Sequence, residues 1–508
     1  MNGTCGSLSI THISYWDTRY CIVQGEEFVL FRWMQKHPRT DLVWVGEELQ
    51  QLDLKDRRLE QRARKLLGEF FCQPGSAIPQ ACGDWAGSKA AYRFFANERV
   101  HSEALLESHR QATLERMRPH RVILAVQDTS SINYSTHPCT AGLGPIGSHR
   151  QNQGLHLHST LALTPEGQCL GVIDAQLKAR ASLRSARERK ATINRKPVEE
   201  KESVKWLGGF EAARACVEQL PSQNQIVSVC DREGDLYELL LLGQQHRGRV
   251  DVLVRARCKR RVKSEERFLW ELVAAESPLG QQKVKLPRRP GRAAQEVVLE
   301  IRCREVELPS PQDKARHFGK REPLRVWAIE ARQVVPKGAR EPICWRLLTT
   351  IPTQNFAQAC EKVAWYTQRW QIEIFHKILK SGCRIEARQL ESAARLGRAL
   401  ALDLIVAWRI LALSRQGRLA PNEYCVGVLS EAEWKILYCS IHPGKSVPVQ
   451  PPRIDEAVKW IARLGGFLGR KGDGFPGPIT LWRGLQRLHD LCSGSAIANQ
   501  LHNFVGNA

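Results

Sequence analysis

The chain has 508 residues, enough for about three domains. Hydrophobic residues make up 43% of it, which suffices for sizeable cores and excludes a wholly disordered chain. Lysine and arginine total 75 against 53 acidic residues, a formal net charge of +22 that favours a nucleic-acid partner. A membrane surface is the weaker alternative, because no stretch approaches the ~20 apolar residues of a spanning helix. Charge that serves solubility alone is the simplest alternative.

The sixteen cysteines are scattered, and no CxxC pair occurs, so a structural zinc site is not expected. Cysteines within apolar runs behave as small hydrophobic side chains, and we expect a reducing cytoplasm. Residues 1–30 lack the basic start and unbroken apolar core of a cleavable signal peptide.

Residues 1–40 show no clear periodicity and are expected to form a poorly ordered leader, unless Met1 is not the natural start. Residues 41–118 are expected to form a helical domain, with leucines at helical spacing in 46–71, a Gly/Pro break, and further helical segments at 89–97 and 102–117. Its exposed arginines favour DNA contact. The alternative is that they only solvate the helices.

Residues 119–415 are expected to form an α/β core. Three strand-like runs, at 121–131, 155–163 and 169–177, have short connections typical of a meander. A basic loop follows at 178–196. The pattern then predicts a helix at about 200–220, a strand ending at Asp231, a helix at about 235–245 and a strand at 251–256.

Residues 257–344 break this alternation and are expected to form a basic, β-rich insertion. A strand at 345–352 then returns to the core, a helix starts near Asn355, and a helix at about 392–413 closes the core. Residues 416–508 are expected to form a C-terminal helical domain, with a linker up to 452 and a helical tail at 453–492.

Residues 366–380, YTQRWQIEIFHKILK, predict one amphipathic helix. At ~100° per residue, one arc of roughly 80° carries Tyr366, Arg369, Glu373, Lys377 and Lys380. The opposite arc is apolar and carries Ile372, Phe375, Ile378 and Leu379. A single carboxylate among cations favours a site that holds a metal ion and a polyanion together. The alternative is a surface helix with ordinary ion pairs.

Two further acids, Asp128 and Asp231, each end an apolar strand-like run. Because sites form at the carboxyl ends of strands in an open sheet, the two acids are expected to meet there. A helix lying across that edge would add Glu373. Clustered carboxylates raise one another's pKa and are tolerated when Mg²⁺ neutralises them. Two such ions can clamp the attacking and leaving oxygens of a phosphodiester.

Each aspartate also has a structural alternative. Asp128 precedes Thr-Ser-Ser and could cap a turn, and Asp231 could cap the following helix. Asp235 competes for either role, whereas Asp174 falls within a strand and is not expected to take part. The strand, strand, helix order of the three acids together favours catalysis.

These motifs resemble the DDE transposases of bacterial insertion sequences, in the group that includes the Tn-five transposase. The family's Tyr-x2-Arg-x3-Glu-x6-Lys (YREK) signature is matched by Tyr366, Arg369, Glu373 and Lys380. Its two aspartate contexts are matched by Asp-Thr-Ser-Ser at 128–131 and Val-Cys-Asp-Arg-Glu at 229–233. Further family-like segments lie at 91–94, 201–207 and 464–467, so the resemblance covers roughly residues 41–500.

The resemblance implies a ribonuclease-H-like mixed-sheet core with a β-rich insertion, an N-terminal DNA-binding domain and a C-terminal dimerisation domain. It implies cut-and-paste transposition, in which DNA is nicked at the transposon end, a hairpin forms and opens, and the 3′ end joins target DNA. Two Mg²⁺ ions, for which Mn²⁺ substitutes, would be held by Asp128, Asp231 and Glu373. The partners would be DNA with terminal inverted repeats, target DNA and a second copy of the chain.

The resemblance also implies roles in DNA binding. Arg369, Lys377 and Lys380 would bind phosphates beside Glu373, and Tyr366 would donate its hydroxyl to one. Trp345 would stack on a flipped base, unless it is a core aromatic.

Arg255 would lie near the DNA end, unless it is only a surface charge. His158 has a family-like context, but a satisfied strand histidine is favoured over a catalytic one. A non-catalytic, DNA-binding regulator of transposition and a stand-alone nuclease are the rival functions.

Overall fold

The computed structural model describes residues 42–147, 151–181, 198–257, 259–263, 265–286, 295–310, 323–335 and 342–505. The predicted leader at 1–40 lies outside these residues, as does most of the predicted basic loop at 178–196. In the described part of the chain, no helix is both long and apolar enough to cross a membrane. The cysteines that the structure describes are free thiols.

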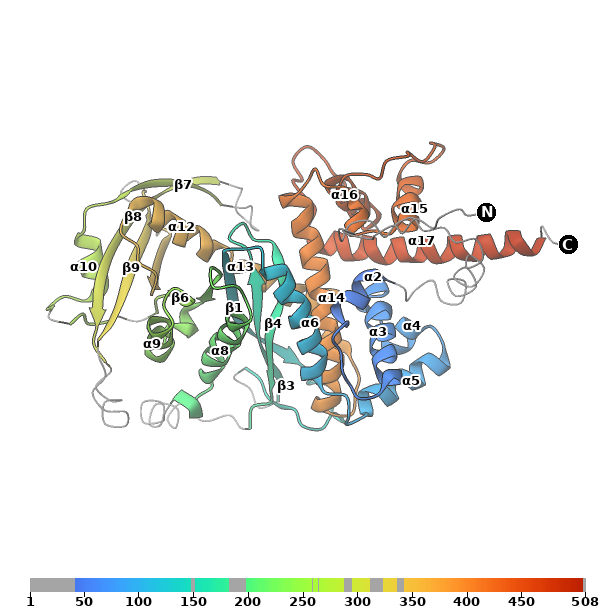
Figure 1. The fold of residues 1–508 in the computed structure, drawn as a ribbon, viewed down its shortest axis with the longest axis horizontal. Helices are drawn as coiled ribbons and strands as arrows, with labels where there is room; N and C mark the ends of the chain where they lie inside the picture. Colours follow the sequence, from blue (N-terminus) through green and yellow to red (C-terminus); the bar gives the residue numbers. More distant parts are fainter. Residues whose placement is uncertain are drawn as a thin grey trace, which may run out of the picture.

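One large mixed sheet occupies the left half of the view in Figure 1, with the N- and C-terminal helices to its right. Its strands are β1 (Val122–Asn133), β2 (Gly144–Pro145), β3 (Gln153–Leu163), β4 (Cys169–Lys178), β5 (Gln225–Cys230), β6 (Val250–Arg255), β7 (Gly280–Leu286), β8 (Gln295–Leu308), β9 (Leu324–Gln333) and β10 (Cys344–Thr349). β1, β3 and β4 form the predicted antiparallel meander, and β5 and β6 continue parallel to β1. The order β4-β3-β1-β5-β6 is that of a ribonuclease-H-like core, which confirms the predicted fold class.

The strands of the 257–344 region extend the same sheet. β10 pairs with β6, and β9, β8 and β7 follow outward in that order. Helix α10 (Leu269–Ala275) packs on this part of the sheet.

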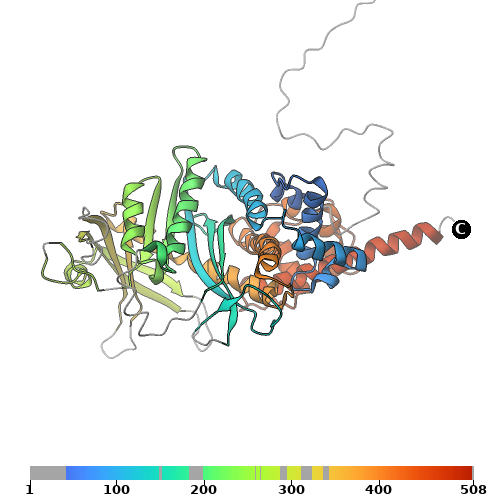
Figure 2. The ribbon, with the colours of Figure 1, turned by 90° about the horizontal axis from the view of Figure 1, so that it is seen from below.

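Helices cover both faces of the sheet because side chains of a strand alternate between its faces. In β1, Ile123 and Ala125 belong to one core cluster, and Leu124 and Val126 belong to the other. The first cluster is covered by α8 (Val204–Glu218), α9 (Tyr237–Gln245) and α10. The second is covered by α12 (Phe356–Thr367), α13 (Trp370–Lys377) and α14 (Ala393–Leu419). Figure 2 shows the green helices and the orange helices on opposite sides of the sheet.

The N-terminal helices pack against the long helix α14 (Figure 1). They are α2 (Val43–Glu48), α3 (Arg57–Cys72), α4 (Ile78–Cys82), α5 (Trp85–Ala96) and α6 (Ser102–Met117). The predicted single helix at 46–71 is wrong, because the chain leaves the helix after Glu48 and starts a new one at Arg57. Asp56 caps this second start by accepting a hydrogen bond from the Arg58 backbone at 2.9 Å.

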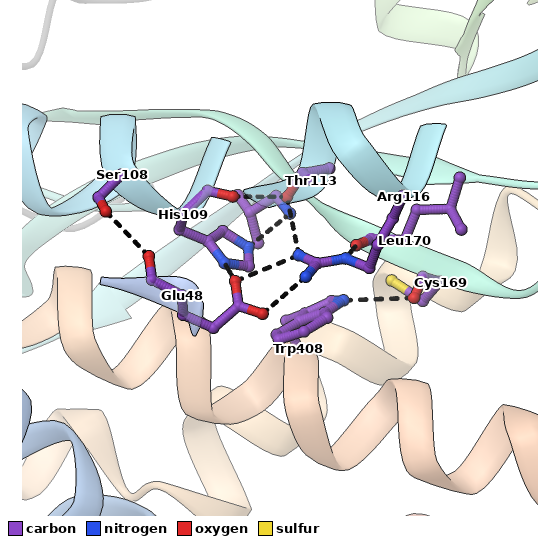
Figure 3. Close-up of polar contacts among 9 residues, drawn as sticks. Glu48, Ser108, His109, Thr113, Arg116, Cys169, Leu170 and Trp408 are labelled. Carbon is purple, nitrogen blue, oxygen red and sulfur yellow. Dashed lines mark hydrogen bonds and ion pairs between the residues drawn. The ribbon is translucent and has the colours of Figure 1, made fainter. Parts of the chain in front are cut away.

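A buried polar network joins α2, α6, β4 and α14 (Figure 3). His109 Nδ1 donates to Glu48 Oε2 at 2.5 Å, and its Nε2 accepts from the Val172 N–H at 3.0 Å. Arg116 Nη1 donates to Glu48 Oε1 at 2.7 Å, and its guanidinium lies 4.3 Å from the ring centroid of Trp408. The network therefore ties the N-terminal helices to the core.

The C-terminal part contains α15 (Glu431–Ile441), α16 (Ile454–Leu464) and α17 (Pro478–Val505). The prediction of a linker up to residue 452 is wrong, because α15 lies within it. Ser430 and Glu433 form a capping box at its start, and Trp434 and Leu437 are buried.

Candidate active site

Asp128 and Asp231 lie at the same level on neighbouring parallel strands. The last paired residues of β1 and β5 are Val126 and Val229, and each acid lies two residues farther along. Asp231 directly follows β5, as predicted. The prediction that Asp128 ends its strand is wrong, because β1 stays paired with β3 as far as Asn133. Both acids nevertheless lie where the parallel pairing stops, at the carboxyl edge.

The predicted continuous helix at 366–380 is divided in the structure. α12 ends at Thr367, α13 begins at Trp370, and a π-helical turn at Ile378–Gly382 follows α13. The predicted apolar arc is confirmed, since its four members are buried: Ile372, Phe375, Ile378 and Leu379. On the predicted polar arc, Glu373 is exposed but Tyr366 is buried.

Arg369 lies between Asp128 and Glu373. Its Nη1 donates to Asp128 Oδ2 at 3.4 Å, and its Nη2 donates to Glu373 Oε1. Burial raises the pKa of Asp128 to about 6; Arg369 opposes this shift, while Asp231 and Glu373 add to it. Asp128 is therefore exposed to the charges of both other acids.

Carboxylate oxygens from two strands and a helix are the ligands that a hard divalent cation prefers. Within the described ranges, however, no group of three His, Cys, Asp or Glu side chains lies close enough to hold one ion. The guanidinium of Arg369 lies between Asp128 and Glu373 and contacts both carboxylates. The Glu373 side chain is 55% exposed and has room to turn towards the aspartates. With that movement, the donor set fits a divalent cation.

The structural alternatives for the aspartates can be compared with their contacts. Asp231 does cap the following turn, since its Oδ1 accepts from the Glu233 N–H at 2.7 Å. This capping and a position at the site coexist. Asp235 is engaged elsewhere, in an ion pair with Arg260. Asp174 lies within β4 and accepts from Gln176 Nε2 at 2.8 Å.

Arg255 and Tyr366 adjoin the acids. Arg255 ends β6, one residue past the pair that joins β6 to Cys230, and is therefore level with Asp231. Burial raises the pKa of Tyr366; nearby Arg369 and Arg255 lower it, and Asp231 raises it further. Tyr366 therefore lies close enough to Arg369, Arg255 and Asp231 for their charges to affect its pKa.

Trp345 lies at the same edge of the sheet. Leu347 on β10 pairs with Arg255 at the end of β6, and Trp345 comes two residues before Leu347. The ring is half-buried against the core, so one part of it is available at the edge.

The two predicted lysines continue beyond Glu373. Lys377 is exposed on the last turn of α13. Lys380 lies in the π-helical turn with its Nζ 3.9 Å from Glu386 Oε1. It lines a cavity of about 370 Å³ together with Arg384. The two lysines therefore place further positive charges on the chain after Glu373, and that of Lys380 is paired with Glu386.

His158 is a satisfied strand histidine, as the sequence favours. Its Nε2 lies 3.1 Å from Gln127 Oε1, and its Nδ1 lies 2.8 Å from Thr129 Oγ1. Because the amide oxygen only accepts, Nε2 carries the proton and Nδ1 accepts from the threonine. Burial lowers the pKa of His158 to about 3, so the ring is neutral. Thr129 in turn donates its backbone N–H to Asp128 Oδ1 at 2.8 Å.

Two buried polar residues near the acids, His376 and Ser159, were not predicted from the sequence. His376 Nε2 lies 2.7 Å from Ser159 Oγ, and both side chains are buried. The spacing of His376, three residues after Glu373, was an available signal. Its partner lies on a distant strand and could not be found without the fold.

Three family models match the chain. They are described as "Transposase DNA-binding" (residues 42–100), "Transposase DDE domain" (residues 211–408) and "Transposase Tn5 dimerisation domain" (residues 405–503). The DDE match includes Asp231 and Glu373 and begins after Asp128.

A cryo-EM structure of the piggyBac transposase synaptic complex with hairpin DNA is 9% identical to the chain, with a TM-score of 0.33. That match covers 93% of this chain and 81% of the other, at a similarity too low to support an argument. The DDE domain implies dependence on a divalent metal ion. With DNA-binding, DDE and dimerisation domains in this order, the chain belongs to the DDE transposases related to the Tn5 transposase.

Proposed function

We propose that this transposase performs cut-and-paste transposition. It would bind the inverted repeats at transposon ends, nick the DNA, form and open a hairpin, and transfer the freed 3′ end to target DNA. The observation that supports this chemistry is that Asp128 and Asp231 lie level at the carboxyl edge of neighbouring parallel strands, while Arg369 links Asp128 to Glu373. One such site suits every step, because each is a phosphodiester displacement.

Asp128, Asp231 and Glu373 would hold two Mg²⁺ ions per site, or Mn²⁺ in their place. Bound ions of this kind supply an activated water and stabilise the charge of the displaced oxygens. The protein's own contribution would be to hold one carboxylate on a strand, one directly after the neighbouring strand and a third on a helix. The Thr129 backbone N–H, which donates to Asp128 Oδ1, would orient this carboxylate.

The cationic side chains would hold the DNA backbone. Arg369 offers a planar pair of donors for a phosphate, and Lys377 and Lys380 extend the contact along the strand. Tyr366 would donate its hydroxyl, and Arg255 would bind near the DNA end. Trp345 would hold an extruded base by stacking during hairpin formation.

We propose the division of the chain that the sequence predicts. Residues 41–118 would bind DNA, residues 119–415 would catalyse, and residues 416–508 would dimerise when DNA is bound. Exposed apolar side chains on the last helix support a second copy as partner: Leu491, Ile497 and Leu501. The protein would act in the bacterial cytoplasm and be nucleoid-associated when bound to DNA.

The decisive experiment is a nicking assay on DNA that carries the element's ends, with Mg²⁺, comparing the parent with Asp231→Ala. Nicking by the parent alone, followed by products that join two DNAs, is the expected result. Binding without nicking by the parent would instead identify a non-catalytic regulator. Hydrolysis without joined products would identify a stand-alone nuclease.

A further inference from the structure

His376 lies on the buried side of α13, three residues after Glu373. Its Nε2 is 2.7 Å from Ser159 Oγ on β3. The His376 side chain is 7% exposed and Ser159 is fully buried. Burial lowers the pKa of His376 to about 3, so a neutral ring makes this hydrogen bond.

Ser159 is the cross-strand partner of Asp128. The antiparallel pairing of β1 and β3 places the two residues directly opposite each other, and opposite residues project to the same face of a sheet. The hydrogen bond therefore runs from the helix that carries Glu373 to the residue beside Asp128. It therefore connects α13 to the sheet, and the distance between α13 and the sheet affects how close Glu373 can come to Asp128.

At its start, α13 is also tied to β1 by the ion pair of Arg369 with Asp128, which is the contact that a metal ion bound at Asp128 would displace. The contacts along the rest of the helix are less specific. Ile372 and Phe375 are fully buried, and apolar packing of this kind has no preferred direction. A helix held by packing alone can rotate or slide by fractions of a turn. A hydrogen bond requires a defined distance and angle, and so fixes one point of the helix against the strand.

We propose that His376 and Ser159 are positioning residues for the active site. Their hydrogen bond sets the placement of α13 on the sheet and thereby the distance that Glu373 must cover to reach Asp128. Neither residue touches DNA or a metal ion in this role. The inference rests on the proposed catalytic role of the three acids.

The test compares variants that remove or retain this hydrogen bond. Ser159→Ala and His376→Leu remove it, whereas His376→Gln places an amide nitrogen near the position of Nε2. Both removals should slow single-turnover nicking about 10- to 100-fold, while the affinity for end-containing DNA stays within about twofold. His376→Gln should recover most of the rate, and combining Ser159→Ala with His376→Leu should add little to either change alone.

Ser131→Ala is the matched control. Ser131 Oγ lies 3.2 Å from His156 Nδ1, so this variant removes a serine–histidine hydrogen bond between the same two strands without touching α13. It should nick at a rate close to that of the parent. Equal loss of rate in Ser131→Ala and Ser159→Ala would overturn the proposal, as would parent-like nicking by Ser159→Ala.

A second measurement does not depend on nicking. Electron paramagnetic resonance of Mn²⁺ added to the full chain reports metal affinity, which should fall about tenfold or more in Ser159→Ala and stay unchanged in Ser131→Ala. Unchanged Mn²⁺ affinity in Ser159→Ala would refute the positioning role. A parent that binds Mn²⁺ in this pattern but never cuts DNA would contradict the proposed transposition and leave the positioning role supported.

Discussion

Arg369 is ion-paired with Asp128, with its Nη1 3.4 Å from Oδ2, at the place where the carboxylate is proposed to hold a metal ion. The same guanidinium contacts Glu373. A guanidinium and a divalent cation cannot both occupy the space between two carboxylates. Under the proposed function, Arg369 would therefore compete with the metal ion in the free protein and would have to leave this position when a metal ion binds.

This competition predicts opposite effects for Arg369→Gln. Affinity for Mn²⁺ in the absence of DNA should rise several-fold, since a competing positive charge is removed. Nicking should fall by about 10- to 100-fold, since a phosphate ligand is lost. Electron paramagnetic resonance and single-turnover nicking measure the two effects. A fall in both quantities would contradict the competition.

Glu373→Ala should abolish nicking and leave DNA binding largely intact. The side chain is half-exposed and contacts Arg369, so its removal creates no cavity and frees a cation that binds DNA. Gel-shift affinity and nicking should be measured on the same end-containing DNA. Glu361→Ala is the control, because that side chain is 49% exposed and lies on the preceding helix. Equal loss of binding and nicking in Glu373→Ala would contradict a metal-binding role.

Trp345→Ala should impair hairpin formation more than first-strand nicking. Stacking on an extruded base is worth about 1–3 kcal/mol, and the first nick does not require extrusion. Trp345→Phe keeps an aromatic ring and should lie between the parent and Trp345→Ala. Denaturing gels that separate nicked from hairpin products give both rates. If nicking fell as far as hairpin formation, Trp345 would be a core aromatic that stabilises the fold and would not be the residue that stacks on the extruded base.

The site shows what a sequence can predict and what it cannot. The three acids stand out because each follows a local pattern, either an apolar run or a helical spacing. The continuation of β1 past Asp128 depends on its pairing with β3, which is a long-range property. The break between α12 and α13 was missed because the helical spacing runs through it. The hydrogen bond between His376 and Ser159 joins residues far apart in the sequence and follows only from how α13 packs on β3.

His489 gives the stability of the folded chain a predictable pH dependence. Its Nδ1 lies 3.3 Å from the Cys72 carbonyl oxygen on α3, and its Nε2 lies 3.5 Å from Glu433 Oε1 on α15. Burial lowers its pKa, but contacts with Cys72 and Glu433 outweigh burial and raise it to about 10 from the ordinary value of 6.5. The folded state therefore holds this proton more tightly than the unfolded chain.

The stability that this proton supplies is fully present below pH 6.5 and is lost as the pH rises to about 10. The melting temperature of the parent should therefore fall more steeply over that range than that of His489→Gln. Differential scanning fluorimetry across the range measures it. His101→Gln, at an exposed histidine, should follow the parent curve. Parallel curves for the parent and His489→Gln would show that the residue titrates normally.

The network around Glu48 predicts a large loss of stability on removal of one carboxylate. Glu48 is 1% exposed, and burial raises its pKa, but His109 and Arg116 outweigh burial and hold it below the ordinary value. Glu48→Ala leaves the guanidinium of Arg116 without its anion between α6 and α14. Breaking a fully buried ion pair costs about 3–5 kcal/mol; because the Arg116 side chain is 30% exposed, the loss here should lie at or below the lower end of that range.

Urea denaturation followed by tryptophan fluorescence should show this loss, and limited proteolysis should cut the N-terminal helices of Glu48→Ala sooner. Glu47→Ala is the matched control, because Glu47 is the exposed neighbour on the same helix and should change stability by less than about 0.5 kcal/mol. If both variants unfolded at the same urea concentration, apolar packing against α14 would be what holds the DNA-binding helices to the catalytic core. If only Glu48→Ala loosened the N-terminal helices, the ion pairs of Glu48 would be what fixes these helices to the core. A DNA end bound by the helices would then be held at a fixed distance from the proposed active site by this network.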